Sequence, residues 1–164
     1  MKGKICCFIG DSKIPFEDYE NISERVREET VKLIKKGYKN FCTGAETGFD
    51  ILVALNIFRL RLEHPEIRLI LVLPYRYKAK TGQRNDREIY TEIRVRNFNI
   101  EDADYVKYTS DNHNRGCIFK RNQYLADNSS TCVCYQRYEK GGIAYAVKYA
   151  KRQGVDVINI ANVI

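Results

Sequence analysis

Short apolar runs alternate with longer amphipathic segments along the chain. The runs are almost continuously hydrophobic, as in "KICCFIG" and "IRLILVLP". Such continuity is typical of strands that are covered on both faces of a parallel sheet. We therefore predict strands at 4–10, 40–44, 67–74, 104–110, 130–136 and 155–160.

In the segments between these runs, the apolar residues are spaced as in amphipathic helices. In 21–37, apolar side chains recur at every third or fourth position and so share one helical face. Asn21 followed by Glu24 has the pattern of a capping box, and Gly37 suits the end of a helix. Further helices are predicted over 48–63, 86–102, 115–127 and 142–153.

The regular alternation of strand and helix predicts an α/β fold. Strands joined through helices form a mostly parallel sheet with right-handed crossovers and helices on both faces. A length of 164 residues fits a single domain over 1–164, and no repeat, low-complexity tract or linker divides it. We expect one doubly wound sheet.

Composition restricts the compartment and the class of protein. No apolar run approaches the roughly 20 residues that a membrane span needs, and the N-terminal run is short for a secretory signal. We therefore expect a cytoplasmic protein with no membrane partner. The six cysteines lie mostly in apolar runs without a CxxC pair, which predicts buried free thiols in place of a metal site or disulfides.

Loops that contain glycine follow four of the predicted strands, at the edge where parallel sheets bind their ligands. They are "GDSK" (10–13), "TGAETGFD" (43–50), "PYRYKAKTGQR" (74–84) and "RYEKGG" (137–142). Glycine lets backbone N–H groups approach an anion, and a helix N-terminus favours negative charge. A tight turn explains any single glycine, but four such loops on one edge predict a ligand site.

The formal net charge of +7 suits nucleic acid, a phosphorylated small ligand or an ordinary solvated surface. Seven basic and three acidic residues between Arg76 and Arg96 supply +4 of it. That segment fits either a basic flap over a phosphate or an exposed loop and solvated helix face. Arg121 and Asn122 add a bidentate phosphate donor and an amide, with an ordinary surface arginine as the alternative.

Taken together, these motifs resemble the SLOG superfamily of Rossmann-like proteins, in its YpsA-like branch. The resemblance runs from about residue 6 to 160 and includes "TGAETGFDILVAL", "RNQYLADNSS" and "GGIAYAVKYAKRQGVDVINI". It implies a nucleotide or nucleotide-derived ligand at the C-terminal edge of the sheet, and a role as sensor or regulatory protein. By position, it implies these ligand-binding residues: Gly10, Asp11, Ser12, Lys13, Gly44, Ala45, Glu46, Gly48, Pro74, Arg121, Asn122, Gly141 and Gly142.

Two positions depart from the branch that the chain resembles. The branch has a Gly-His-Arg-like turn after its first strand, where this chain has Gly10 to Lys13. Lys13 can replace a cation, whereas Asp11 would repel phosphate unless it contacts a ribose hydroxyl. Ile143 stands where the branch has a threonine after the glycine pair, so a hydroxyl contact to the ligand is missing.

Two other functions stay open. LOG enzymes of the same superfamily cleave the base–ribose bond of nucleoside monophosphates, using an acid just after the glycine-rich turn. Here only Ile143 to Val147 follow, while Glu46 and Glu139 lie in neighbouring loops, so no catalytic residue is assigned. The other alternative is single-stranded DNA binding as in DprA, which needs exposed aromatic platforms. The expected partner is a small nucleotide-like ligand, with nucleic acid as the alternative, and a homodimer is left open.

Overall fold

The computed structural model describes residues 3–45, 48–76 and 102–161, whose strands form one sheet. The strands are β1 (Ile5–Gly10), β2 (Asn40–Thr43), β3 (Arg68–Leu73), β4 (Tyr105–Tyr108), β5 (Thr131–Tyr135) and β6 (Asp156–Asn159). Their order is β4-β3-β2-β1-β5-β6, and every neighbouring pair is parallel. The predicted α/β fold with a parallel, Rossmann-like sheet is confirmed.

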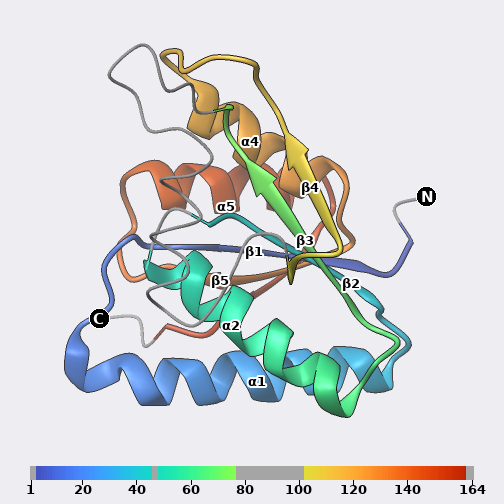
Figure 1. Ribbon diagram of the computed structural model, residues 1–164. Helices are drawn as coiled ribbons and strands as arrows, with labels where there is room; N and C mark the ends of the chain where they lie inside the picture. Colours follow the sequence, from blue (N-terminus) through green and yellow to red (C-terminus); the bar gives the residue numbers. More distant parts are fainter. Residues whose placement is uncertain (1–2, 46–47, 77–101, 162–164) are drawn as a thin grey trace.

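Helices cover both faces of this sheet, as predicted (Figure 1). They are α1 (Tyr19–Lys35), which follows the short 3-10 helix η1 (Phe16–Asp18), α2 (Gly48–Glu63), α4 (Cys117–Asp127) and α5 (Gly142–Arg152). Helices α1 and α2 lie together on one face, and α4 and α5 lie on the other. Among the described residues, no helix is long and apolar enough to cross a membrane. The predicted helix 86–102 and most of the basic segment 76–96 fall outside the described residues.

Each face of the sheet has its own hydrophobic core. Phe8 and Phe41 pack toward α1 and α2, whereas Cys7 and Cys42 belong to the core under α4 and α5. Burial on both faces explains why the sequences of the central strands are almost continuously apolar. Cys42, Cys7 and Cys132 are direct neighbours in register across β2, β1 and β5. All six cysteines are buried and none forms a disulfide, which confirms the prediction of buried thiols.

The first helix begins earlier than the sequence indicated. The capping box predicted at Asn21 and Glu24 is wrong, because α1 begins at Tyr19. The 3-10 helix η1 runs directly into α1, so Asn21 already lies within the first turn of the helix. The predicted C-terminal signal holds, since Gly37 follows the helix with a left-handed φ of +94°.

The order of the strands creates a crevice between β1 and β5. From β1 the chain continues through β2, β3 and β4 in one direction, and then returns to the other side of β1 to form β5 and β6. The segments that leave the C-terminal ends of β1 and β5 therefore run to opposite faces of the sheet (Figure 1). Open parallel sheets bind ligands at such a switch point.

Candidate functional site

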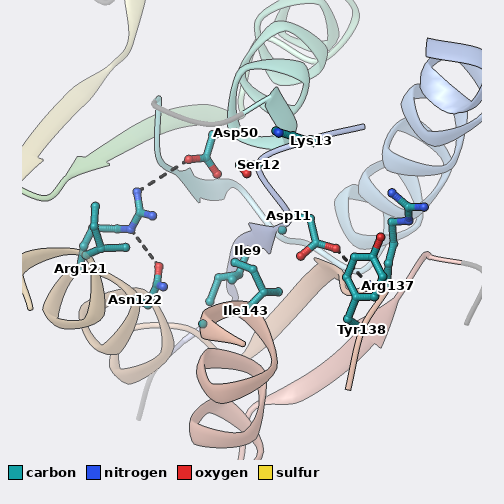
Figure 2. Close-up of a pocket in the computed structure, with 13 residues that line it drawn as sticks. Ile9, Asp11, Ser12, Lys13, Asp50, Arg121, Asn122, Arg137, Tyr138 and Ile143 are labelled. Carbon is teal, nitrogen blue, oxygen red and sulfur yellow. Dashed lines mark hydrogen bonds and ion pairs between the residues drawn. The ribbon is translucent and has the colours of Figure 1, made fainter. Parts of the chain in front are cut away.

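A pocket with a volume of about 430 Å³ opens at the switch point between β1 and β5 (Figure 2). Volumes of roughly 300–1,000 Å³ are typical of small-molecule sites. The loops after β1 and β5 and the N-terminal parts of α2, α4 and α5 form its walls. Its lining residues are Ile9, Gly10, Asp11, Ser12, Lys13, Asp50, Ile118, Arg121, Asn122, Arg137, Tyr138, Gly142 and Ile143.

The structure brings many of the predicted ligand-binding residues together. Those that line the pocket are Gly10, Asp11, Ser12, Lys13, Arg121, Asn122 and Gly142. Gly44 and Gly48 lie beside the lining residues Arg121 and Ser12 without lining the pocket, Ala45 is buried outside the lining, and Gly141 lines a neighbouring pocket. Pro74 follows β3, which is two strands away from β1. Glu46 lies outside the described residues.

A buried ion pair forms part of the pocket wall. Arg121 in the second turn of α4 is 5% exposed, and Asp50 in the first turn of α2 is 3% exposed. Figure 2 shows the two side chains pointing toward one another, with Nη1 of Arg121 3.8 Å from Oδ2 of Asp50. The Nε–H of Arg121 donates a hydrogen bond of 2.9 Å to Oδ1 of Asn122.

One nitrogen of the Arg121 guanidinium makes no hydrogen bond to any described residue. Within the described part of the chain, Nη1 of Arg121 has no hydrogen-bond partner, although it is buried. A buried donor without an acceptor costs about 1–3 kcal/mol, and more when it is charged. With Oδ2 of Asp50 3.8 Å away, no hydrogen bond from the described residues satisfies this end of the guanidinium, and its positive charge in the pocket wall would attract an anion.

Three of the predicted glycines make room for protein atoms. A Cβ at Gly44 would collide with Nη1 of Arg121 and lie 2.6 Å from Oδ2 of Asp50. A Cβ at Gly10 would collide with the ring of Phe49, and one at Gly48 would lie 2.9 Å from the backbone oxygen of Ser12. Because these three positions have no side chain, Arg121 can lie beside Asp50, and the end of β1 and the loop after it can pack against the start of α2.

The glycine pair at the start of α5 is different, because it borders open space. A Cβ at Gly141 or Gly142 would meet no atom within 4 Å, so neither glycine is needed for close packing of the helix. Gly141, the N-cap, has a φ of +107° and makes no side-chain capping bond. The first turn of α5 contains no acidic residue. Its free N–H groups and the helix dipole therefore favour an anion here.

Asp11 connects the ends of β1 and β5 at the edge of the pocket. Its N–H donates to the Tyr135 oxygen at 3.0 Å, and its Oδ2 accepts a 3.1 Å hydrogen bond from the N–H of Arg137. The Arg137 guanidinium lies 5.3 Å from the ring centre of Tyr138, which is 58% exposed. The pocket thus has a carboxylate suited to hydroxyl groups and an aromatic ring beside a cation.

Sequence reasoning missed Asp50, Arg137 and Tyr138 as lining residues. Asp50 lies two residues after Gly48 at the start of a helix whose next residues are almost all buried. An acidic residue that begins such an apolar helix was the available signal, because carboxylates are rarely buried unless they are paired. With Lys13, Arg121 and Arg137 against Asp11 and Asp50, the charged residues of the pocket sum to +1.

Solved structures share this fold. DNA processing protein A from Helicobacter pylori, which binds single-stranded DNA, matches with a TM-score of 0.60 and 15% identity, over 94% of this chain and 63% of that chain. DNA processing protein A from Streptococcus pneumoniae gives a TM-score of 0.60 at 10% identity, over 94% of this chain and 49% of that chain. The chain therefore spans less than two thirds of either protein, and at these identities the likeness concerns the fold.

A family model identifies the family of this chain, which also has distant sequence relatives. UPF0398 proteins of Bacillus thuringiensis (strain Al Hakam) and Bacillus cereus (strain AH187) are each 22% identical over 137 residues, which is 82% of this chain and 72% of theirs. A sequence model of the YspA SLOG family matches residues 14–160. The predicted resemblance to the SLOG superfamily is thereby confirmed: the chain belongs to the YspA SLOG family.

Proposed function

We propose that the pocket between β1 and β5 binds a nucleotide or a nucleotide-derived ligand, and that the protein acts as a sensor or regulator of it. The observation that carries this proposal is Arg121. Its guanidinium is buried in the pocket wall, and its Nη1 donor has no hydrogen-bond partner among the described residues. Phosphate oxygens match the charge and the planar fork of donors that an arginine presents.

The surroundings of Arg121 favour the same class of ligand. The first turn of α5 offers backbone N–H groups at Gly142, and Lys13 adds a second cation. Tyr138 provides an exposed ring on which a base can stack. Asp11 would repel a phosphate but is suited to accept a hydrogen bond from a ribose hydroxyl. Phosphate, base and sugar each have a matching group in one pocket.

Asp50 supports a second candidate function, the hydrolysis of N-glycosidic bonds in nucleoside monophosphates. The sequence has no acid after Gly142, but Asp50 supplies a carboxylate to the same pocket from α2. A carboxylate beside the sugar can assist the attack of water on the anomeric carbon. We rank this function second, because a carboxylate that pairs with Arg121 is equally useful in a site that binds its ligand without reacting.

Calorimetric titration with AMP and ADP-ribose tests the proposal. Arg121→Ala should weaken binding roughly ten- to a hundredfold, because it removes a charge-assisted hydrogen bond of about 1.5–3 kcal/mol. Gly142→Val should also block binding, since its Cβ meets no protein atom and its side chain would occupy the ligand's space. Circular dichroism should show that both variants are folded at the titration temperature.

The matched control is Arg152→Ala at the opposite end of α5, where the exposed arginine lies away from the pocket. Equal affinities for Arg121→Ala, Gly142→Val and this control would remove the pocket as the ligand site. Release of free adenine from AMP, lost in Asp50→Asn, would instead place hydrolysis above binding.

A further inference from the structure

A second pocket lies on the other side of the first turn of α5. Its volume is about 540 Å³, and residues of the loop after β5 and of α5 line it. Its charged lining residues are Lys140, Lys148, Lys151 and Glu139, which gives a sum of +2. This is a higher charge than in the first pocket, and the function proposed above does not use it.

The two pockets adjoin at two consecutive glycines, where no side chain separates them. Gly142 lines the first pocket and Gly141 lines the second, so consecutive residues border both. No atom lies within 4 Å of the Cβ position of either glycine. A linear anion can therefore pass from one pocket to the other over the N–H groups of the first turn of α5.

We infer that the ligand is a dinucleotide, in which phosphates that cross the first turn of α5 join one nucleoside in each pocket. This inference rests on the proposed function, because the first nucleotide occupies the Arg121 pocket. A mononucleotide would leave the net charge of +2 in the second pocket without a ligand anion. The inferred linker places negative charge between Arg121 on one side and the lysines of that pocket on the other.

Volume and exposed rings favour a second nucleoside over a further phosphate alone. The second pocket is at least as large as the first, and both fall within the range of small-molecule sites. Each pocket includes one exposed tyrosine among its lining residues, Tyr138 in the first and Tyr145 in the second. Tyr145 also packs against Phe119, with ring centres 5.0 Å apart, which restricts its position.

Calorimetry with AMP, ADP-ribose and diadenosine diphosphate tests this inference. The wild-type protein should bind diadenosine diphosphate more than about tenfold more tightly than AMP. The Lys148→Ala/Lys151→Ala variant should lose about five- to thirtyfold in affinity for diadenosine diphosphate, as expected for two exposed charge contacts, and change little toward AMP. The control is Lys35→Ala/Lys39→Ala, which removes the same charge from exposed positions near the end of α1.

The outcomes separate the two proposals. If AMP binds through Arg121 but diadenosine diphosphate binds no more tightly, the dinucleotide inference fails and the first proposal stands. If no nucleotide binds, both fail. Equal losses in the two double-lysine variants would show a general charge effect and also overturn the inference. Tighter binding of single-stranded oligo(dA), with a steep dependence on salt, would replace the free dinucleotide by a nucleic acid.

Discussion

The buried pair of Asp50 and Arg121 should behave as one unit in the stability of the fold. Two unit charges about 4 Å apart attract by about 4 kcal/mol at an effective dielectric constant of about 20. Desolvation of both groups offsets most of this gain, because each side chain is almost fully buried. Removing one partner leaves the other charge buried without its counterion, which costs about 3–5 kcal/mol.

A double-mutant cycle measures this coupling. Asp50→Asn and Arg121→Met should each lower the free energy of unfolding by about 3–5 kcal/mol. The double variant should lie within about 2 kcal/mol of the wild type, because it leaves no unpaired charge. Urea unfolding at pH 7, followed by circular dichroism with the m-values compared, gives the four free energies.

The exposed pair of Arg27 and Glu63 provides the matched control. Its side chains lie 2.8 Å apart but are 41% and 55% exposed. The cycle of Arg27→Met and Glu63→Gln should therefore give a coupling energy below about 1 kcal/mol. A coupling energy for Asp50 and Arg121 as small as that of the control would refute the reasoning from burial.

Two further perturbations test the packing behind the pocket and the buried thiols. Gly44→Ala should lower the free energy of unfolding by about 1–3 kcal/mol, whereas Gly142→Ala should be neutral or stabilising, because only the first adds a collision. Equal melting temperatures for these variants would contradict the contacts assigned to Gly44. Burial raises the pKa of both Cys42 and Cys134 from 9.0 to about 12. The folded state thus favours the neutral thiols, so stability should hold below pH 9 and fall between about pH 9 and 12, a decline that should be shallower in Cys42→Ala/Cys134→Ala. The same pKa shift should keep the thiols unreactive toward iodoacetamide at pH 8, and rapid alkylation of the folded protein would count against it.

The central strands could be predicted because helices cover both of their faces. A strand covered on both faces is almost continuously apolar, as in 69–73 and 132–135, and the predicted and observed positions of β3 and β5 agree closely. The start of α1 could not be predicted in this way. The local pattern at Asn21 matches a cap, but a 3-10 helix before it extends the helical conformation toward the N-terminus.

The candidate site was only partly accessible to sequence reasoning. Loops at strand ends identify Gly10 to Lys13 and Gly142, because the edge of a parallel sheet is known once the strands are assigned. The partner of Arg121 was not accessible, since Asp50 becomes its neighbour only when α2 and α4 meet across the edge of the sheet (Figure 2). The roles of Gly10 and Gly44 likewise depend on contacts with distant side chains.

The row of cysteine thiols across the centre of the sheet has a consequence for the chain during its synthesis, before the sheet is complete. Cys7 lies on β1, between Cys42 on β2 and Cys132 on β5. Because β5 is synthesised long after β1, one side of Cys7 has no strand beside it for most of translation. The helices that cover this face, α4 and α5, also come late in the chain. An emerging chain therefore exposes these thiols to oxidants or electrophiles before the sheet closes, and a thiol modified in this interval would not fit the close-packed core that later covers it.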